Sequence, residues 1–337
     1  MPGRDLEARK DLRDMVSVAN LYYKENLSQR EIGERLHLSV SKVSRLLARA
    51  TKEIVTVTIT PPRLIALEQE LKKRFKFLSD VIVIPEGEKP KSNLGPTGAK
   101  YLEALMRGKE VVRITIACGE TLYSVVENLD PGELTGQTQL YIYPMNVSDI
   151  TEQLAIFPTT LVAIMAAKYF RVWGVDNIHA YTPQIPEIIH EMGKQERTTL
   201  LENYGISSVL KEAESADIFL LGIGTGKKNR RFSQVLERHK IDMEKIKNNV
   251  VGEINYQPFD RHGRFIQEVC DKVIGVSVDS LKANSRKIGK YVVAIAGGEE
   301  KIEPISISLR NGPYYNCLIT DERAAEGVLE IEKQRWV

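Results

Sequence analysis

The basic and hydroxyl side chains between residues 38 and 52 offer the clearest chemistry in this sequence. The stretch contains Lys42, Arg45, Arg49 and Lys52 and no acidic residue, so it would present positive charge to a polyanion. An arginine can donate two hydrogen bonds to a guanine edge, and a serine is short enough to let a helix approach the bases. The residues that we predict at base edges or nearby phosphates are Ser41, Lys42, Ser44 and Arg45. A merely solvated basic helix face is the alternative, which charge alone does not exclude.

A helix-turn-helix would place that stretch on a duplex, because its second helix lies in the major groove while the first braces it. Apolar spacing predicts a first helix over residues 12–25, with Asn26 as its stop. Ser28 and Glu31 have the spacing of a capping box that opens a short second helix, and Ser39 can cap a third. The residues that we predict at register-setting phosphates are Gln29, Arg30 and Arg49. A helical hairpin used only for packing is the alternative interpretation.

The helical part is expected to form a small domain of its own. The predicted inner face of the third helix comprises Val43, Leu46, Leu47 and Ala50. Residues 54–59 alternate Val and Ile with Thr, which predicts a half-buried strand that the following prolines end. Residues 64–77 are expected to form an amphipathic helix that acts as a linker or an oligomer contact. We therefore predict a helix-turn-helix DNA-binding domain over 1–60 and an effector-binding and oligomerisation domain over 61–337.

From about residue 80 the pattern changes to short apolar strands that alternate with helices. The predicted strands are 81–84, 114–117, 140–143, 218–221, 273–278 and 291–296, and the predicted helices include 97–107, 121–129, 159–170 and 196–213. Continuous apolar strands between helices are typical of a mostly parallel sheet covered on both faces. The predicted fold class is α/β, with a small helical helix-turn-helix domain followed by a large, mostly parallel α/β domain.

Three Gly-containing turns directly follow apolar strands, at residues 118–121, 222–226 and 297–301. In parallel α/β sheets ligands collect at the carboxyl ends of the strands, and the start of the next helix favours an anion. Thr121 begins such a helix, so a phosphate could bind its hydroxyl and the neighbouring N–H groups. A glycine after a strand is more often only a turn. The 222–226 loop matches no dinucleotide fingerprint, because Lys227 stands where the third glycine belongs, and no cofactor is predicted.

Composition narrows the remaining possibilities. The chain has 337 residues, of which 42% are hydrophobic and 27% charged, with a net charge of +2; these are ordinary values for a globular protein of about two domains. Cys118, Cys270 and Cys317 form no CxxC pair and no signal peptide is evident, so we expect a reducing, cytoplasmic location and no zinc site. The apolar stretch 161–167 is too short to span a membrane.

Neither the histidines nor the tryptophans predict a catalytic centre. His262 stands near Asp260, but an exposed turn histidine is a simpler interpretation than acid–base chemistry. Trp173 and Trp336 are expected to pack against protein rather than to stack on a ligand. We predict no catalytic residue and no metal ligand, because no Cys or His cluster has suitable spacing.

A set of short segments occurs in a fixed order along the whole chain. These segments are Lys42-Val43-Ser44-Arg45-Leu46-Leu47, Gly119-Glu120-Thr121, Leu221-Gly222-Ile223-Gly224, Val251-Gly252-Glu253-Ile254, Phe259-Asp260-Arg261-His262-Gly263, Ala296-Gly297-Gly298-Glu299-Glu300-Lys301 and Leu318-Ile319-Thr320-Asp321-Glu322. An ordered set is far more specific than any single loop. From about Arg13 to Leu329, the chain resembles the SorC family of sugar-responsive transcriptional regulators.

The resemblance implies an effector domain with a fold similar to sugar-phosphate isomerases of the glucosamine-phosphate deaminase and ribose-phosphate isomerase type. Such family members usually bind phosphorylated sugars or related compounds and assemble as dimers or tetramers on long operators. Carried over by motif, Gly119, Glu120 and Thr121 would hold the phosphate end of an effector. Asp260 would accept hydrogen bonds from sugar hydroxyls, and Lys301 would supply a cation. A carboxylate acceptor and a lysine suit these roles.

The chain departs from the family pattern after the predicted third strand. Many relatives have a Gly-rich turn there, whereas this chain has Tyr143-Pro144-Met145-Asn146-Val147-Ser148-Asp149. Larger side chains could therefore enter the pocket and change the size of the effector. Gln184 follows a segment that lines the pocket in relatives, so we include it among the candidate effector-binding residues.

Two functions from different classes remain open at this point. In the first, the chain is a regulator that binds a double-stranded DNA operator as a homodimer or homotetramer, and a sugar phosphate, sugar or polyol shifts its operator affinity. In the second, it is a sugar-phosphate isomerase or deaminase with an accessory DNA-binding domain, for which Asp260 and Lys301 would be the motivating pair. A structural nucleoid protein would not need so large a neutral domain. The sequence favours the first.

Overall fold

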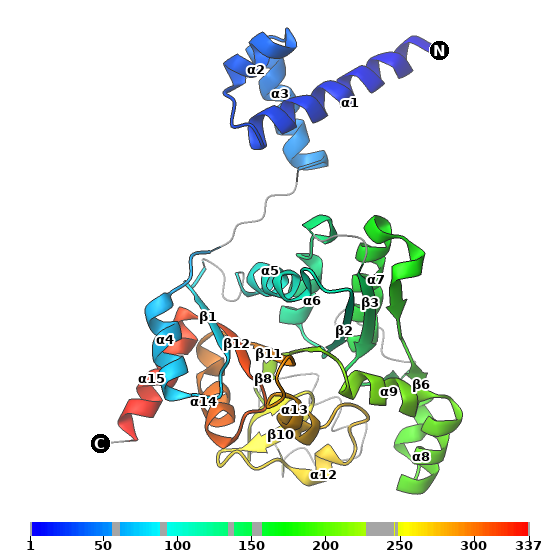
Figure 1. The fold of residues 1–337 in the computed structure, drawn as a ribbon, viewed down its shortest axis with the longest axis vertical. Helices are drawn as coiled ribbons and strands as arrows, with labels where there is room; N and C mark the ends of the chain where they lie inside the picture. Colours follow the sequence, from blue (N-terminus) through cyan, green and yellow to red (C-terminus); the bar gives the residue numbers. More distant parts are fainter. Residues whose placement is uncertain are drawn as a thin grey trace. The chain divides into compact units, whose positions relative to one another are not determined.

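The computed structural model describes residues 2–55, 61–87, 93–133, 138–149, 157–226, 246 and 249–335. These residues form two compact units, Met1–Ile59 and Thr60–Val337, which are treated separately below. Figure 1 shows the helical N-terminal unit and the α/β unit along the chain. Among the described helices, none combines the length and the apolar character that crossing a bilayer requires.

The N-terminal unit consists of α1 (Pro2–Tyr23), α2 (Gln29–Leu36) and α3 (Val40–Glu53). Its core is built from buried apolar side chains of all three helices: Met15, Val18, Ala19, Leu21, Ile32, Val43, Leu46, Leu47 and Ala50. The predicted inner face of the third helix is therefore confirmed. The first helix starts at Pro2 rather than near residue 12, because the charged residues before position 12 favour a helix without supplying an apolar stripe.

The second and third helices of this unit start where the sequence predicts. Ser28 and Glu31 form a complete capping box, with the Ser28 N–H donating to Glu31 Oε2 at 2.8 Å. Ser39 Oγ accepts from the Lys42 N–H at 3.3 Å and caps α3. The turn between the two helices is tight, since a Cβ on Gly33 would lie 2.7 Å from the Leu38 carbonyl oxygen. His37 takes up the left-handed conformation at φ 53° to end α2.

The strand predicted over residues 54–59 is wrong for its first two residues. The Ile54 and Val55 N–H groups both donate to the Ala50 carbonyl oxygen, at 2.9 and 2.8 Å, and so continue the end of α3. Residues 56–59 lie outside the described part of the chain. Alternating β-branched residues thus did not outweigh the hydrogen bonding of a helix that was already formed.

Removing the Ser39 cap gives a test of how the N-terminal unit is held. Ser39→Ala is expected to destabilise α3 by about 1 kcal/mol, because the Lys42 N–H loses its acceptor. Hydrogen exchange of the α3 amides in the full chain measures this change. Ser44→Ala is the control, since Ser44 is exposed and accepts no capping hydrogen bond. Equal protection in both variants would contradict the assignment of the cap.

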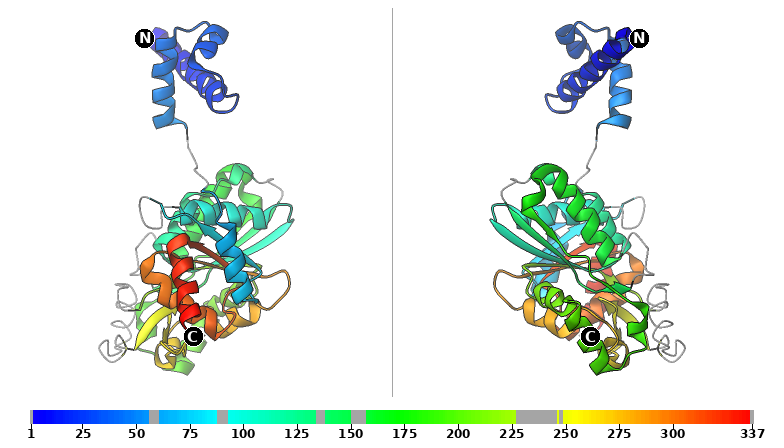
Figure 2. Two further views of the ribbon diagram at one scale, coloured as in Figure 1. Left: turned by 90° about the vertical axis from the view of Figure 1, so that its left-hand side faces the viewer. Right: turned by 90° about the vertical axis from the view of Figure 1, so that its right-hand side faces the viewer.

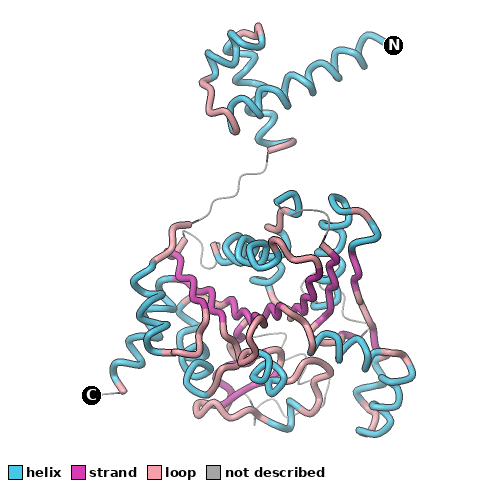
Figure 3. The backbone as a smooth tube through the Cα atoms, viewed as in Figure 1, coloured by secondary structure: helices cyan, strands magenta, loops and turns pink. Residues whose placement is uncertain are grey.

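The larger unit is organised around a seven-stranded, fully parallel sheet. The strand order is β1 (Asp80–Ile84), β12 (Cys317–Asp321), β11 (Tyr291–Ile295), β7 (Ile218–Leu221), β2 (Val111–Ile116), β3 (Gln139–Pro144) and β5 (Ile178–Ala180). In Figure 3 the strands form one twisted layer. The predicted fold class is confirmed, and five of the six predicted strands correspond to β1, β2, β3, β7 and β11. Almost all residues of these strands are buried or half-buried, as expected for a sheet covered on both faces.

Helices cover both faces of this sheet. One face carries α5 (Leu94–Met106), α6 (Glu120–Glu127) and α7 (Pro158–Trp173), which pack side by side. The other face carries α9 (Ile206–Glu214), α13 (Val278–Asn284) and α14 (Ile302–Asn311). The helices α4 (Ile65–Arg74) and α15 (Glu322–Gln334) pack together beside β1 and β12, joined by an ion pair between Arg74 and Glu332 at 3.1 Å. Figure 2 shows this layering from both sides.

Two predicted elements differ from the structure. The strand predicted at residues 273–278 is an irregular segment that ends at α13, with Ser277 as the helix cap. The segment still borders the sheet, because the Val276 N–H donates to the Met145 carbonyl oxygen at 2.8 Å. The helix predicted at 196–213 is two helices, α8 (Lys194–Asn203) and α9, because Gly205 turns the chain at φ 70°.

A three-stranded antiparallel sheet and a short parallel strand pair complete the described part of the α/β unit. The strands β8 (Ile223–Gly224), β9 (Val250–Ile254) and β10 (Gln257–Asp260) form an antiparallel sheet, and α12 (Gln267–Cys270) follows it. The strands β4 (Ser148–Asp149) and β6 (Gln184–Ile185) form a short parallel pair. The β9–β10 hairpin turns through Asn255 and Tyr256, both buried and at positive φ. The Asn255 side chain donates to the Val276 carbonyl oxygen at 2.8 Å, so the hairpin tip is anchored inside the unit.

Candidate DNA-reading helix and effector site

The outer face of α3 presents the short and basic side chains that the sequence predicts. Ser41, Ser44 and Arg45 are all exposed, and Ser41 Oγ lies 3.2 Å from Ser39 Oγ. Arg45 makes no ion pair with any residue in the described part of the chain. Its guanidinium is therefore available to an external acceptor, as a base edge or a phosphate would be.

Lys42 and Arg49 are placed differently from Arg45, because acidic side chains of α1 hold them. Lys42 Nζ lies 3.2 Å from Asp14 Oδ2 and 3.6 Å from Asp11 Oδ1. Arg49 pairs with Asp11 at 3.0 Å and with Glu53, one turn along α3, at 3.2 Å. The hydrogen bond to Asp14 raises the pKa of Lys42, so the ammonium stays charged. Both cations lie on the flank of α3 that faces α1.

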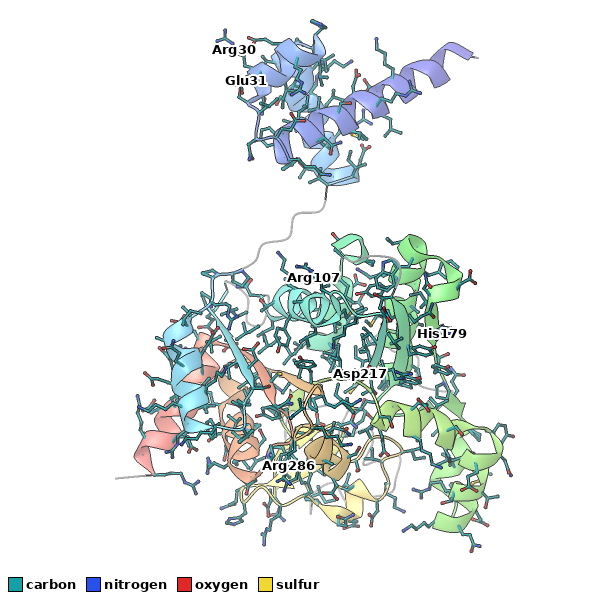
Figure 4. All side chains as sticks on the ribbon, viewed as in Figure 1. Arg30, Glu31, Arg107, His179, Asp217 and Arg286 are labelled. Carbon is teal, nitrogen blue, oxygen red and sulfur yellow. The ribbon has the colours of Figure 1, made fainter. Side chains whose placement is uncertain are left out.

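The two predicted phosphate contacts on α2 lie at its start. Gln29 is the first residue of α2 and is half-buried, and Arg30 is exposed. Arg30 pairs with Glu34 at 3.2 Å, but its side chain remains 84% exposed. Figure 4 shows Arg30 projecting from α2 at the surface of the unit. An exposed pair of this type is weak and gives way readily to a phosphate.

Ala48 is a surface residue of α3 that we did not single out from its sequence. It is exposed and lies four and three residues after Ser44 and Arg45, on the same outer stripe as Ser41. A methyl group in that position suits apolar contact with the methyl group of thymine. The helical spacing of residues 41, 44, 45 and 48 was the sequence signal for Ala48. The prediction relied on charged and hydrogen-bonding side chains and therefore omitted this residue.

The α/β unit brings three of the predicted loops to one edge of the sheet. The chain runs from β2 outward to β3 and β5, and from β7 outward in the other direction to β11 and β12. The winding therefore reverses between β2 and β7, which is the position where ligands bind in sheets of this kind. The loop at 118–121 follows β2, the loop at 222–226 follows β7, and the loop at 297–301 follows the neighbouring β11.

Gly119, Glu120 and Thr121 form the entry to α6 at this reversal point. Gly119 has φ 134° and caps the helix, and among the described residues other than its chain neighbours no heavy atom lies within 4 Å of the position that a Cβ would take. Thr121 is half-buried in the first turn, whereas Glu120 is exposed. The N–H groups of a first helical turn and a hydroxyl beside them are suitable donors to an anion.

Lys301 follows β11 on the same edge and lies close to a buried carboxylate. Burial raises the pKa of Glu253, which also accepts a hydrogen bond from the Tyr256 N–H at 2.7 Å, while the charge of Lys301 lowers it. Glu253 belongs to β9, and the sequence predicted no separate role for it. The charge of Lys301 acts on Glu253, so any anion at Lys301 would share this cation with Glu253.

Asp321 shows why glycine is needed in the loop after β11. A Cβ on Gly297 would lie 2.2 Å from Asp321 Oδ2, which no side chain at position 297 could tolerate. The Asp321 carboxylate caps α15 by accepting from the Ala324 N–H at 2.9 Å. Burial raises the pKa of Asp321, and hydrogen bonds from Ala324 and Gly298 oppose that change. Glycine at position 297 is therefore needed for packing against Asp321 as well as for a close approach of the backbone.

Asp260 is held by its own turn rather than by the sheet edge. Its carboxylate accepts from the His262 N–H at 2.8 Å, the Arg264 N–H at 3.0 Å and Arg264 Nε at 2.9 Å. Burial is the largest single influence and raises its pKa, but these hydrogen bonds and the charge of Arg264 together outweigh burial, so the pKa lies below its usual value. His262 is exposed in this turn, as expected. Gly119, Glu120, Thr121 and Lys301 all follow strands of the seven-stranded sheet at its carboxyl edge, whereas Asp260 ends β10 of the small antiparallel sheet.

The lowered pKa of Asp260 makes a pH-dependent prediction. Since its folded-state pKa is below the unfolded value of about 3.9, the carboxylate adds stability above that pH and loses it as the pH falls through the folded pKa. Asp260→Asn should lower the melting temperature at pH 7, and the difference should shrink below about pH 4. Calorimetry of both proteins from neutral to acid pH measures this. A difference that stays constant with pH would contradict the role of the charge.

The remaining predicted positions lie beside β3 and beyond it. Gln184 is exposed on β6, where it pairs with Ser148 of β4, outside the seven-stranded sheet. Trp173 is buried and donates to the Pro131 carbonyl oxygen at 3.2 Å, which confirms a packing role, whereas Trp336 lies outside the described residues.

Asn146 is the most informative residue that was not predicted. It directly follows β3 and Met145, is only 4% exposed, and neither atom of its amide has a partner among the described residues. A buried amide without partners costs free energy unless a bound molecule or water satisfies it. The departure from the family pattern at residues 143–149 was the sequence signal for this position, although it predicted larger side chains in the pocket rather than a buried polar group.

A helix-turn-helix unit followed by a parallel α/β unit defines a class of DNA-binding regulators with an effector domain. The family model described as "Putative sugar-binding domain" matches residues 60–330, and the model for sigma-70 region 4 matches residues 18–54. This chain belongs to the SorC/DeoR family of transcriptional regulators.

Relatives of similar length support this assignment. The chain is 24% identical to the sorbitol operon regulator of Klebsiella pneumoniae over 96% of this chain and 100% of that protein. It is 23% identical to the deoxyribonucleoside regulator of Bacillus subtilis over 93% of this chain and 96% of that protein. These relatives are transcriptional regulators and not enzymes.

Solved structures show the same fold. The full-length sorbitol operon regulator SorC from Klebsiella pneumoniae superposes with a TM-score of 0.70 at 24% identity, covering 95% of this chain and 99% of that chain. A DeoR family transcriptional regulator from Listeria monocytogenes gives a TM-score of 0.61 at 22% identity over 78% of this chain and 98% of that one. At this identity the likeness concerns the fold.

Proposed function

We propose that a small metabolite, a phosphorylated sugar or a related polyol, controls the affinity of this regulator for its operator. The metabolite binds at the carboxyl edge of the sheet, and the helix-turn-helix reads double-stranded DNA. Binding shifts the population between conformations that differ in operator affinity. The assembly is a homodimer or homotetramer in the cytoplasm.

One observation carries this proposal more than any other. The start of α6, with Gly119 and Thr121, lies where the winding of the sheet reverses, and Lys301 follows β11 on the same edge. Helix N–H groups, a hydroxyl and an ammonium on one edge form a donor set for a phosphate or another anion. The buried amide of Asn146 after β3 adds a group that hydroxyls of a sugar could satisfy.

The relatives' names agree with an effector rich in hydroxyl groups. One is named for a sorbitol operon and another for deoxyribonucleosides, which are a polyol and compounds that contain a sugar. In our proposal Gly119, Glu120 and Thr121 hold the phosphate end and Lys301 supplies a cation. Gln184 and Asp260 are candidate acceptors for hydroxyls, although Asp260 would then share the donors of its own turn.

The DNA side of the proposal assigns α3 to the major groove. Ser41, Ser44 and Arg45 read base edges, and Gln29 and Arg30 contact phosphates. Lys42 and Arg49 belong to the predicted contact set as well, but both pair with carboxylates of α1. The exposed Arg45 is the observation that supports this assignment best.

Thermal-shift screening of the full chain tests the proposal. The panel contains phosphorylated sugars with five or six carbons, the matching free sugars, and polyols. A metabolite that binds only the folded state adds about 2.7 kcal/mol of stability at a hundred times its dissociation constant, so it raises the melting temperature. A flat response to the whole panel would overturn the proposed effector class. A hit must also change binding to a duplex selected from a random-sequence pool.

A further inference from the structure

The outer face and the flank of α3 differ in how their cations are held. Ser41, Ser44, Arg45 and Ala48 form an exposed stripe at spacings of three and four residues. Lys42 and Arg49, seven residues apart, lie on the neighbouring flank against α1. A single helix therefore carries an open arginine and two cations that already have carboxylate partners.

Asp11 links the two held cations into a network. One of its carboxylate oxygens lies 3.6 Å from Lys42 Nζ, and the other lies 3.0 Å from the Arg49 guanidinium. Asp14, one turn along α1, completes the partners of Lys42 at 3.2 Å, and its side chain is only 22% exposed. An isolated surface pair is weak, but a shared network loses several contacts at once when one cation leaves.

We propose that Asp11 and Asp14 keep Lys42 and Arg49 against α1 while α3 is in the groove, so that sequence is read by the stripe of Ser41, Ser44, Arg45 and Ala48 without two additional phosphate contacts. This inference rests on the proposed DNA-reading role of α3. Transfer of both cations to DNA would take these partners from the carboxylates of Asp11 and Asp14 and leave them beside phosphates of the same charge, and transfer of Lys42 alone would take this partner from Asp14. The acidic pair therefore limits sequence-independent affinity and acts as a positioning device for specificity.

The consequence follows from how phosphate contacts act. Each cation that pairs with a phosphate strengthens binding to every sequence and steepens the salt dependence by about 0.9 in the slope of log K against log salt. When two cations are kept away from the DNA phosphates, binding to non-operator DNA weakens more than discrimination between bases does. The sequence thus predicts that Lys42 and Arg49 contact DNA, whereas this inference keeps both side chains on α1 in the folded unit.

The test compares three variants of the full chain with the unaltered protein. They are Asp11→Asn/Asp14→Asn, Lys42→Gln/Arg49→Gln, and all four substitutions together. The probes are a duplex selected by the unaltered chain from a random-sequence pool, and a scrambled duplex of the same composition. Fluorescence anisotropy between about 50 and 200 mM salt gives the affinities and slopes, and circular dichroism checks that each variant is folded.

The asparagine variant is expected to bind the scrambled duplex about tenfold more tightly, with a slope steeper by about 1 to 2 per protomer. The glutamine variant should weaken binding to both probes by a similar factor, because it leaves the carboxylates of Asp11 and Asp14 without these cations near the phosphates. The fourfold variant, which removes both cations and both carboxylates, should stay within about threefold of the unaltered chain on both probes. The gain should vanish in the fourfold variant, because it requires the freed cations. A gain that persisted there would reflect only the lost negative charge and would overturn the inference.

Two further results would also overturn it. One is a fourfold variant that loses tenfold or more on the selected duplex, which would show that Lys42 or Arg49 contacts DNA. The other is an asparagine variant with unchanged slope and affinity. If the unaltered chain preferred no duplex at all, the proposed function itself would fail, so the two failures are distinguishable.

Discussion

Arg45→Ala is expected to weaken binding to the selected duplex by about ten- to a hundredfold, while binding to a scrambled duplex changes far less. The side chain is exposed on α3 and makes no ion pair in the described chain, so its loss costs no internal contact. A good bidentate contact to a base contributes about 1–3 kcal/mol of discrimination. Anisotropy titrations at one fixed salt concentration, on both duplexes, measure the ratio of the two affinities.

Arg30→Ala is the matched control for this prediction. Arg30 is also exposed, but it lies at the start of α2 and is proposed to contact a phosphate. Its removal should weaken binding to both duplexes by a similar factor and reduce the salt slope by about 1. If Arg45→Ala lowered both affinities equally, α3 would be a phosphate-binding helix and the assignment of base readout would be incorrect.

Lys301→Met is expected to abolish the rise in melting temperature that an anionic effector produces. Lys301 supplies the cation of the proposed phosphate site, so a phosphate in Lys301→Met would lack its ionic partner. At a hundred times the dissociation constant the stabilisation by the effector is about 2.7 kcal/mol, all of which should disappear at the same concentration. Differential scanning fluorimetry with the best metabolite from the panel measures the loss.

Lys333→Met serves as the control for Lys301→Met. Lys333 is an exposed lysine of α15 whose side chain is 76% exposed and lies 4.0 Å from Glu70. This variant should keep the full response to the effector. Thr121→Val should lose part of the response, because the hydroxyl beside the first turn of α6 is removed while its volume is kept. An unchanged response in Lys301→Met would show that the site is wrongly placed.

The helix-turn-helix was predictable because local signals decide it. The capping box of Ser28 and Glu31, the cap at Ser39 and the apolar stripe from Val43 to Ala50 act within a few residues, and the structure contains each of them. What the sequence did not predict is which cations are engaged. That depends on Asp11, which lies more than thirty residues before Arg49 and meets it only after α1 packs on α3.

The parallel sheet was predictable for a similar reason. Its strands are continuous apolar runs, and the helices between them have helical spacing, so the fold class followed from pattern alone. The β9–β10 hairpin was not predicted, because Asn255 and Tyr256 are an unusual pair for a two-residue turn at positive φ. The β-branched segment at 273–278 resembled a strand, yet Ser277 caps a helix there.

The effector site was only partly predictable. Loops that follow strands must meet at one sheet edge, which brought Gly119, Thr121 and Lys301 together. The partners of a carboxylate do not follow from such a rule. Arg264 satisfies Asp260 from within its own turn, which depends on the exact conformation of that turn. The Asn146 amide has no partner among the described residues, and this outcome depends on how segments far apart in sequence pack around it.

The proposed function depends on the linkage between effector binding and operator affinity, which a single titration tests most directly. The full chain is titrated into a labelled selected duplex at fixed salt, with and without the metabolite that raises its melting temperature, and in parallel with Lys301→Met. We predict that the metabolite changes the dissociation constant for the duplex at least fivefold in the unaltered chain, the lower end of typical allosteric coupling of about 1–3 kcal/mol, and leaves Lys301→Met unaffected. Equal dissociation constants with and without a metabolite that demonstrably binds would contradict the central claim.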